Sequence, residues 1–244
     1  MKKLISIIFV TILFCHSLIG SVFALNIGWA GTGDDTRKEL PPEDWYADAY
    51  KFVTKEFIMT TSSSHSTTDQ YGHTHSTCSF FGEREVIRAE VATIIHRYDW
   101  NEETTSKGHY IYSTCQAFAD VPDGKWMTPA VQWAADNGIV NGVGGDSFAP
   151  NRTITREEFA TIMYRYTEFK NVERDISADL SAYTDGGEVS AWAKDAMAWA
   201  VGEGLISGKP GGLLAPQDTI TRAEVAVIVY RYNNNVLPHR DNKK

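Results

Sequence analysis

Residues 126–156 read WMTPAVQWAADNGIVNGVGGDSFAPNRTITR, and residues 192–222 read WAKDAMAWAVGEGLISGKPGGLLAPQDTITR. The two stretches have the same internal spacing: a second Trp follows the first after seven residues, and the final Arg follows after 30. Self-similarity at a fixed period predicts a chain built from packed repeats. A functional site should therefore recur in each repeat or lie between repeats.

A third, degenerate copy precedes these two. Its elements are Trp45, Phe80-Phe81-Gly82 and Ile87-Arg88-Ala89-Glu90, with 43 residues from Trp to Arg. The 13 extra residues lie within 60–79, a stretch rich in Ser, Thr and His that predicts a surface loop. The predicted segments are a signal peptide at 1–24, an N-terminal arm or linker at 25–41, repeats at 42–100, 116–168 and 180–233, and a polar tail at 234–244.

Each repeat is predicted to form two helices joined by a loop. The second helix carries a one-sided apolar stripe, for example Phe159, Ile162, Met163 and Tyr166. The first helix is predicted to open at the Trp, and large aromatic side chains mostly serve packing, so we expect these tryptophans in the core. One helix pair cannot bury both of its stripes alone, so the three pairs are expected to form one all-α body.

The loops are predicted to start with a left-handed glycine. Gly138 and Gly204 follow the first helices of the second and third repeats, where a C-terminal cap favours glycine. In the first repeat, Phe57 and Thr61 replace the two loop glycines of the other repeats. We therefore expect a different backbone path in that loop.

Two capping boxes mark the starts of the second helices. Thr155 with Glu158, and Thr221 with Glu224, have the spacing in which a Thr hydroxyl and a Glu carboxylate cap each other's backbone N–H groups. In the first repeat Ile87 takes the place of the Thr, so the box is broken.

An arginine follows each cap. Arg156 and Arg222 lie in the first helical turn, where the helix dipole disfavours a cation. Two explanations remain open: a salt bridge to a carboxylate of a neighbouring repeat, or an anion site made by free backbone N–H groups and the guanidinium. Arg97, Arg165 and Arg231 are predicted in the last turn of the same helices, with a structural role.

The N-terminus has the pattern of a secretory signal. Lys2-Lys3 precede an apolar run from Leu4 to Leu13, and Val22-Phe23-Ala24 resembles a cleavage site, although a retained anchor helix is the alternative. Removal of residues 1–24 leaves 21 basic and 31 acidic groups, a net charge of −10. We therefore expect an exported protein without a membrane span in the mature chain, and an acidic protein of this kind is a poor partner for nucleic acid.

Cysteines and histidines near the insertion suggest two further features. Cys78 and Cys115 are predicted to form a disulfide, with two free thiols as the alternative. The insertion also holds His65, His73 and His75, which have the ligand chemistry of a zinc or copper site. Their spacing matches no closed motif, so we favour a solvated loop and expect no metal or cofactor.

The repeat resembles the S-layer homology (SLH) domain. The resemblance covers residues 42–232 and is weakest in the first repeat. In the second repeat it rests on Phe118-Ala119-Asp120-Val121, Trp126, Ala130, Gly138-Ile139, Gly142, Phe148-Ala149-Pro150 and Ile154-Thr155-Arg156-Glu157-Glu158.

The resemblance implies a fold and a function. SLH domains usually occur in threes, form a pseudo-threefold, all-helical bundle, and hold exported proteins on the bacterial cell wall without a covalent bond. Their ligand is typically a secondary cell-wall polysaccharide, often carrying pyruvate ketals, in grooves between repeats. The resemblance places Arg156, Arg222 and Arg88 in these grooves, together with Gly142 and Gly208. The changes in the first repeat favour two competent grooves over three.

The sequence leaves three candidate functions for the protein. We favour attachment to the wall or S-layer surface; the alternatives are a structural S-layer or cell-envelope subunit and a wall-directed hydrolase. The hydrolase is disfavoured because the sequence has neither Gly-x-Ser-x-Gly nor His-Glu-x-x-His. A protein partner is expected to bind through the insertion or the N-terminal arm, since these are the segments outside the repeats.

Overall fold

The computed structural model describes residues 45–60, 62–68, 74–102, 114–176 and 178–237. The predicted signal peptide and the N-terminal arm therefore lie outside the described residues. The chain divides into a small body of residues 1–37 and 67–75 and a large body of residues 38–66 and 76–244. Of the small body, only the strand ends at 67–68 and 74–75 are described, and all side-chain contacts discussed below lie within the large body.

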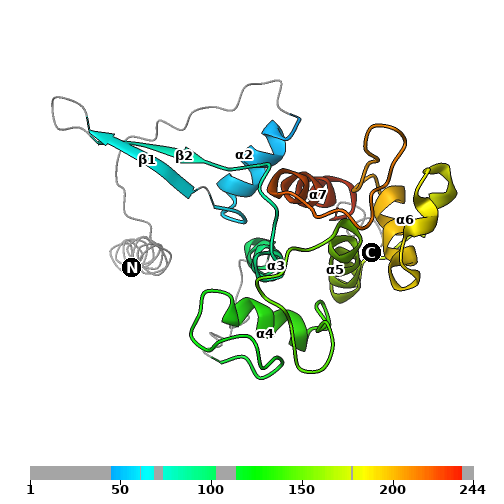
Figure 1. The fold of residues 1–244 in the computed structure, drawn as a ribbon, viewed down its shortest axis with the longest axis horizontal. Helices are drawn as coiled ribbons and strands as arrows, with labels where there is room; N and C mark the ends of the chain where they lie inside the picture. Colours follow the sequence, from blue (N-terminus) through cyan, green and yellow to red (C-terminus); the bar gives the residue numbers. More distant parts are fainter. Residues whose placement is uncertain (1–44, 61, 69–73, 103–113, 177, 238–244) are drawn as a thin grey trace, which may run out of the picture. The chain divides into compact units, whose positions relative to one another are not determined.

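The described residues form helices, as predicted for an all-α protein, and one small sheet (Figure 1). The helices are α2 (Ala47–Lys55), α3 (Arg88–Glu102), α4 (Thr128–Asp136), α5 (Arg156–Phe169), α6 (Lys194–Gly202) and α7 (Arg222–Asn235). Three short 3-10 turns precede α6, at Leu180–Ala182, Gly186–Glu188 and Ala191–Ala193.

The predicted loop in the first repeat contains secondary structure. Strands β1 (Ser62–Thr68) and β2 (Thr74–Ser79) pair in a two-stranded sheet. The prediction of a plain surface loop was therefore wrong for most of the insertion. The reason is that β-branched Thr recurs in both segments and favours extended backbone, although the composition is too polar to predict a core strand.

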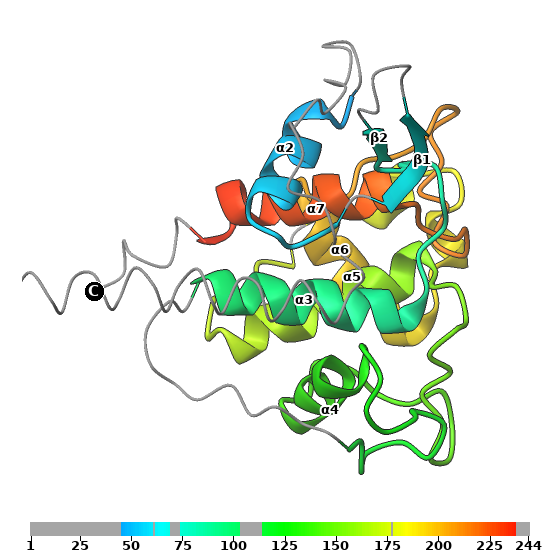
Figure 2. The same cartoon turned by 90° about the vertical axis from the view of Figure 1, so that its left-hand side faces the viewer.

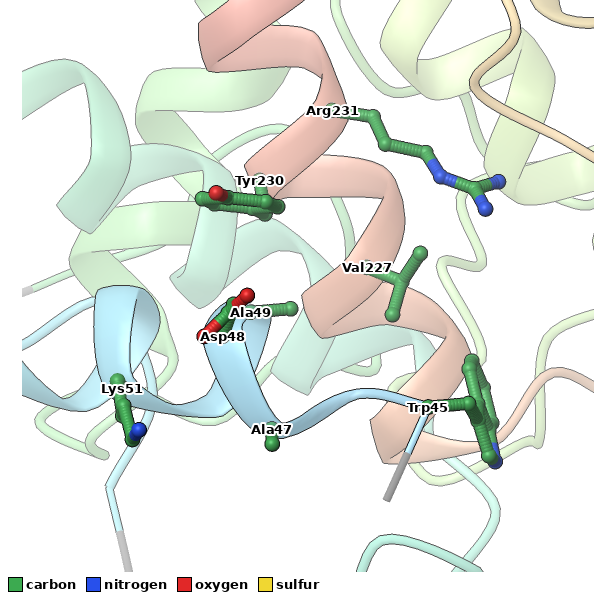
Figure 3. Close-up of a pocket in the computed structure, with 8 residues that line it drawn as sticks. All are labelled: Trp45, Ala47, Asp48, Ala49, Lys51, Val227, Tyr230 and Arg231. Carbon is green, nitrogen blue, oxygen red and sulfur yellow. The ribbon is translucent and has the colours of Figure 1, made fainter. Parts of the chain in front are cut away.

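The second helices of the three repeats form the centre of the large body. Figures 1 and 2 show α3, α5 and α7 side by side, with α4 and α6 outside them. The principal helix contacts join each first helix to the second helix of the preceding repeat: α4 to α3, α6 to α5, and α2 to α7. Figure 3 shows α2 beside α7, the pair that connects the third repeat back to the first.

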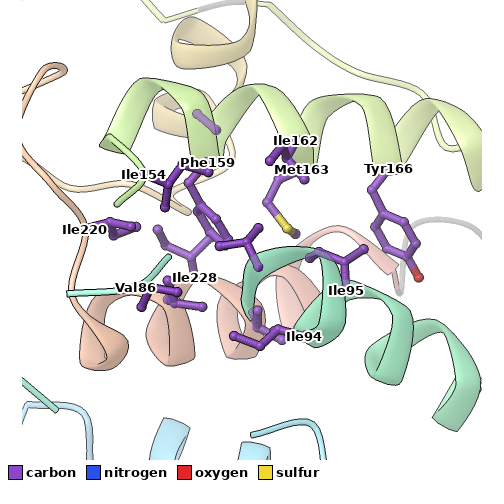
Figure 4. Close-up of a cluster of buried hydrophobic side chains, with 14 of the residues drawn as sticks. Val86, Ile94, Ile95, Ile154, Phe159, Ile162, Met163, Tyr166, Ile220 and Ile228 are labelled. Carbon is purple, nitrogen blue, oxygen red and sulfur yellow. The ribbon is translucent and has the colours of Figure 1, made fainter. Parts of the chain in front are cut away.

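Backbone hydrogen bonds close the same cycle at the N-terminal ends of these helices. Val86 N–H donates to Ile220 O at 3.1 Å, Ile220 N–H to Ile154 O at 3.0 Å, and Ile154 N–H to Val86 O at 3.1 Å. All three side chains are fully buried and point into the core beside Phe159 and Ile228 (Figure 4). The three repeats therefore share one core rather than forming separate ones.

Three tyrosines close the cycle further along the helices. The ring centroids of Tyr98, Tyr166 and Tyr232 lie 6.1, 6.0 and 5.8 Å apart in the three pairs. Aromatic rings at such distances attract one another beyond the burial of their area. A pseudo-threefold bundle stays a prediction, and these closed contacts support it.

Each tyrosine hydroxyl also bonds to a polar residue of the preceding repeat. Tyr98 donates to Asn233 Oδ1 at 3.2 Å, and Tyr166 donates to Asp99 Oδ1 at 3.0 Å. Tyr232 accepts from Thr167 Oγ1 at 3.3 Å. Buried polar groups require such partners, so these bonds fix the order in which the repeats pack.

The first tryptophan of each repeat is not in the core. Trp45, Trp126 and Trp192 are 61%, 48% and 59% exposed, which corrects the prediction that they are buried. The reason is that α4 and α6 begin two residues after the Trp, so this side chain does not follow the helical stripe. The tryptophan seven residues later does follow it, and Trp199 is fully buried.

The loop glycines have the predicted backbone conformation. Gly138 and Gly204 both have φ +67°, in the left-handed region that favours glycine. Phe57 occupies the corresponding position of the first repeat with φ +56°. The expectation of a different backbone path at Phe57 was therefore wrong: the preceding helix imposes the same turn on a bulky residue. Thr61 lies outside the described residues.

Candidate functional site

The junctions between repeats contain most of the predicted site residues. Both capping boxes are confirmed: Thr155 Oγ1 accepts from Glu158 N–H at 3.3 Å, and Thr221 Oγ1 from Glu224 N–H at 3.3 Å. The glutamates accept in turn from the backbone N–H groups of the two threonines, at 3.0 and 2.9 Å. In the first repeat half of the box survives, since Ile87 N–H still donates to Glu90 at 3.2 Å.

The first backbone N–H groups of the second helices are already used. Arg156 N–H donates to Asp218 O at 2.9 Å and Glu157 N–H to Pro216 O at 3.1 Å, both in the next repeat. The other junctions have the same bonds: Arg88 to Arg152, Ala89 to Pro150, Arg222 to Arg84 and Ala223 to Gly82. These N–H groups are therefore not available to an anion.

The Arg156 guanidinium is bound in the same way. Its Nε donates to Leu214 O at 3.1 Å, its Nη2 to Ser207 O at 3.0 Å, and its Nη1 to Glu224 Oε1 at 2.6 Å. The residue is only 3% exposed. The side chain thus crosses the junction and holds the loop and the capping box of the third repeat.

Arg88 and Arg222 make equivalent contacts. Arg88 donates to Phe148 O and Asn141 O, both at 2.8 Å, and its guanidinium lies 4.7 Å from the centre of the Phe148 ring. Arg222 donates to Phe80 O at 3.0 Å and to Thr60 O at 2.7 Å. Burial lowers the pKa of both guanidinium groups below its ordinary value. We call these three side chains, Arg88, Arg156 and Arg222, the arginine clasp.

The arginine clasp bears on the two explanations for a cation at a helix start. The geometry favours the contacts to the neighbouring repeat, because the first backbone N–H groups and at least two donors of each guanidinium group are bound within the protein. Free backbone N–H groups at these helix starts therefore do not form the anion site that the sequence left open as one alternative. Direct ligand contact by Arg156, Arg222 and Arg88 stays a prediction without support from this geometry.

The two loop glycines are required by the packing of the chain on itself. A Cβ at Gly142 would lie 2.7 Å from Ser147 O, and a Cβ at Gly208 would lie 2.7 Å from the Tyr183 ring. Distances of this kind are shorter than van der Waals contact, so only glycine fits without movement. Their part in ligand binding stays a prediction.

Two aspartates that position the loops were not among the predicted site residues. Asp120 accepts from Phe148 N–H at 2.7 Å and from Ala149 N–H at 2.8 Å. Asp185 accepts from Leu214 N–H at 2.6 Å and from Ala215 N–H at 2.7 Å. Asp120 does belong to the repeat motif Phe118-Ala119-Asp120-Val121. A carboxylate in a loop has no periodic pattern, however, so the sequence did not reveal which backbone N–H groups it binds.

The pKa values of these aspartates are lowered. Desolvation raises the pKa of Asp120, but hydrogen bonds from Phe148 N–H, Ser147 Oγ and Ala149 N–H outweigh it and hold the pKa below its ordinary value. The hydrogen bond from Leu214 N–H is the largest cause of the lowered pKa of Asp185. Both carboxylates are therefore bound in their ionised form.

The exposed side of the junctions differs between repeats. Arg152 pairs with Glu158 at 2.5 Å, and Arg84 pairs with Glu90 at 2.6 Å, four residues before the clasp arginine in each case. In the third repeat the same position is Asp218, which pairs with Lys209 at 2.9 Å. The three junctions are thus similar inside and different at the surface.

The described residues include only one of the side chains that were predicted to form a disulfide or a metal site. Cys115 is a free, half-buried thiol, so the structure does not form the predicted bond to Cys78, whose side chain lies outside the described residues. The side chains of His65, His73 and His75 also lie outside them. Among the described residues there is no cluster of three His, Cys, Asp or Glu side chains suited to a metal ion, and no helix has the length and apolar character for crossing a membrane.

Comparison with known proteins identifies the repeats. The S-layer homology domain model matches residues 117–160 and 182–226. The chain is 36% identical over 113 residues to "Exoglucanase XynX" and 28% identical over 154 residues to "Cellulosome-anchoring protein", both of Acetivibrio thermocellus. It is 35% identical over 122 residues to "Surface-layer 125 kDa protein" of Lysinibacillus sphaericus.

These matches cover 46%, 62% and 49% of this chain, but only 10%, 33% and 10% of the respective relatives. The similarity is therefore confined to the repeats, and the chain spans a third or less of the length of these relatives. The first repeat is not matched by the domain model, in agreement with its changed cap and its insertion. The chain thus contains S-layer homology domains, one in its second repeat and one in its third.

Proposed function

We propose that this protein attaches non-covalently to the bacterial cell wall by binding a secondary cell-wall polysaccharide, carrying pyruvate ketals, between its repeats. The observation that carries the proposal is the pair of S-layer homology domains, which recurring backbone hydrogen bonds at the junctions join into one body with the first repeat. The protein is accordingly exported and located at the cell wall or S-layer surface.

The relatives support attachment rather than catalysis. Their names include an exoglucanase, a cellulosome-anchoring protein and a surface-layer protein, and what they share with this chain is the repeat region. A region common to proteins with such different names serves a task that they have in common. Attachment to the cell surface is such a task, and glycan hydrolysis is not.

The acidic pair in the second repeat also fits a structural role better than a catalytic one. Glu158 belongs to the capping box and pairs with Arg152. Glu157 is buried and accepts from Ser190 N–H at 3.0 Å, from Ser190 Oγ at 2.8 Å and from Gln217 Nε2 at 2.9 Å. A general acid or base must reach a substrate, and both carboxylates are held by protein groups.

Sedimentation with purified cell walls tests the proposal. The mature protein should pellet with intact walls and remain in the supernatant with walls from which the secondary polysaccharide has been extracted. Equal pelleting with both preparations would assign the binding to peptidoglycan instead, and no pelleting with either would reject attachment to the wall.

A further inference from the structure

An aromatic contact recurs where each second helix packs on the first helix of the next repeat. One ring lies eight residues after the clasp arginine, and the other lies seven residues after the first tryptophan of its repeat. The ring pairs are His96–Trp133, Tyr164–Trp199 and Tyr230–Phe52, with centroids 5.0, 5.5 and 5.6 Å apart. The contact is therefore part of how every repeat packs on its neighbour.

The contact between α3 and α4 differs from the other two in one ring. Tyr164 and Tyr230 supply a phenol at this position, whereas α3 supplies the imidazole of His96. A phenol titrates near pH 10 and stays neutral at physiological pH, but an imidazole changes its charge between about pH 5 and 8. Of the three equivalent contacts, this one alone contains a ring whose charge changes near neutral pH.

The geometry of this pair suits a charged imidazole. The centroid of the His96 ring lies 5.0 Å from that of Trp133, and the two ring planes meet at 61°. A cation within about 6 Å of the centre of an indole is attracted by its π-system, and Trp attracts cations best among the aromatic side chains. Both side chains are half-buried, so the cost of desolvating the imidazolium is only partial. Protonation should therefore strengthen the contact.

The charges on α4 favour the protonated form. The sequence of this helix contains neither Lys nor Arg, and its one acidic residue is Asp136. Asp136 lies three residues after Trp133 on the same side of the helix, and its Oδ1 accepts from Gln132 Nε2 at 2.7 Å. A carboxylate on that side of α4 attracts an imidazolium on α3.

The charges on α3 itself have little net effect. Asp99 lies one turn after His96, and Lys170 binds it at 2.9 Å, so these two charges offset each other. Arg97 follows His96 directly and is rotated by about 100° around the helix. Its charge acts on Arg222 of the third repeat, on the side of α3 away from α4.

The end of α5 also borders the contact. Phe169 packs edge-on against Trp133, with ring centroids 5.8 Å apart. The charged residues in this turn are Arg165, which opposes protonation, and Glu168, which attracts Arg165. The indole and Asp136 therefore determine the sign of the effect at His96.

We propose that His96 makes the packing of α4 on α3 depend on pH. The imidazolium holds Trp133 at acidic pH, and the contact loosens as the imidazole loses its proton. The loop after α4 depends on the same helix, because Asn141 O accepts from Arg88 Nη2 at 2.8 Å. The junction between the first and second repeats is thus sensitive to pH near neutrality, and this inference does not rest on the proposed function.

Hydrogen exchange of the mature protein measures the packing of each helix separately. Protection factors, corrected for the intrinsic effect of pH on exchange, report the local opening of α4 and of α6. From about pH 5.5 to about pH 7.5 the protection of α4 should fall about two- to fivefold, which corresponds to one cation–π contact. In His96→Tyr, which copies Tyr164 and Tyr230, the protection of α4 should not fall. The protection of α6, which packs on Tyr164, should stay constant in both proteins.

Two further variants separate the charge of the ring from its size. Trp133→Phe copies Phe52 and keeps an aromatic ring that attracts a cation less strongly, so the pH effect on α4 should shrink. His96→Gln cannot titrate in this range and should abolish the effect even if the larger ring of His96→Tyr disturbs the packing. Circular dichroism at both pH values checks that each variant is folded.

Three results would overturn the inference. The first is an α4 protection that does not fall in the wild type between the two pH values. The second is an equal fall in His96→Gln, since the effect would then come from another group. The third is an equal fall in α6, because that would be an effect of pH on the whole protein rather than on this contact.

Discussion

The Nη1 atom of Arg156 lies 2.6 Å from Oε1 of Glu224, so the second repeat holds the capping carboxylate of the third. Glu158 faces Arg88 of the first repeat in the same way, at 3.7 Å. Glu158 and Glu224 therefore each cap their own helix and also form an ion pair with the guanidinium group of the preceding repeat. These ion pairs connect the N-terminal end of one second helix to the N-terminal end of the next.

Removal of the Arg156 side chain should unfold the protein more easily. Arg156→Ala leaves Leu214 O, Ser207 O and Glu224 without this partner in a buried junction, and should lower the free energy of unfolding by about 3–5 kcal/mol. Urea denaturation followed by circular dichroism measures the change. Arg152→Ala is the matched control: its side chain is 42% exposed, against 4% for Arg156, and the expected loss is about 0–1 kcal/mol. Normal stability of Arg156→Ala together with lost wall binding would instead support ligand contact by this arginine.

Phe57 should be replaceable by glycine with a gain in stability. Its φ of +56° costs an L-residue roughly 1–2 kcal/mol, and its side chain is 73% exposed, so little packing is lost. Phe57→Gly should therefore raise the melting temperature. Gly138→Ala, at the same position of the second repeat, should lower it, because an added Cβ there meets no neighbouring atom and only the backbone strain changes. A lower melting temperature for Phe57→Gly would show that this exposed ring makes a contact worth more than the strain.

The buried ion pair between Lys170 and Asp99 should be sensitive to the loss of one partner. The two groups are 2.9 Å apart, and Tyr166 also donates to the same carboxylate. Lys170→Met leaves a buried charge uncompensated and should cost about 3–5 kcal/mol of unfolding free energy. The double variant Lys170→Met with Asp99→Asn should recover much of this loss, since the amide oxygen still accepts from Tyr166. Equal losses in the single and double variants would contradict the ion-pair explanation.

Acid should loosen the loops that Asp120 and Asp185 hold. Both folded-state pKa values are lowered, so these carboxylates stabilise the fold above the unfolded pKa of about 3.9, and the contribution is lost as the pH falls through the folded-state value. Asp120→Asn should reduce stability at neutral pH and make it less dependent on pH below about 4. Melting temperatures between neutral and acidic pH measure this. If the melting temperature of the variant falls as steeply with acid as that of the wild type, Asp120 does not cause the loss of stability.

Features that depend on neighbours in the sequence could be predicted. The capping boxes at Thr155 and Thr221 and the left-handed caps at Gly138 and Gly204 involve residues within one helical turn, so spacing alone identifies them. The all-helical class followed from the apolar stripes of the second helices. The same reasoning placed Arg97, Arg165 and Arg231 in the last turn, which was wrong, since those helices continue to Glu102, Phe169 and Asn235.

Features that depend on distant partners could not be predicted. The carbonyl groups that receive the Arg156 guanidinium are 58 and 51 residues away, and no periodic pattern encodes them. The sequence therefore left the salt bridge and the anion site open. Trp45 was misplaced for a different reason: it lies before its helix, so the helical stripe gives no information about its exposure.

Titration of the mature protein with the purified secondary polysaccharide is the most direct test of the account. We predict saturable binding that is lost after mild acid has removed the pyruvate ketals, because the proposed ligand is an acidic sugar. Binding that persists undiminished without the ketals would contradict recognition of the carboxylate. The absence of any binding to the intact polysaccharide would contradict the proposed function itself.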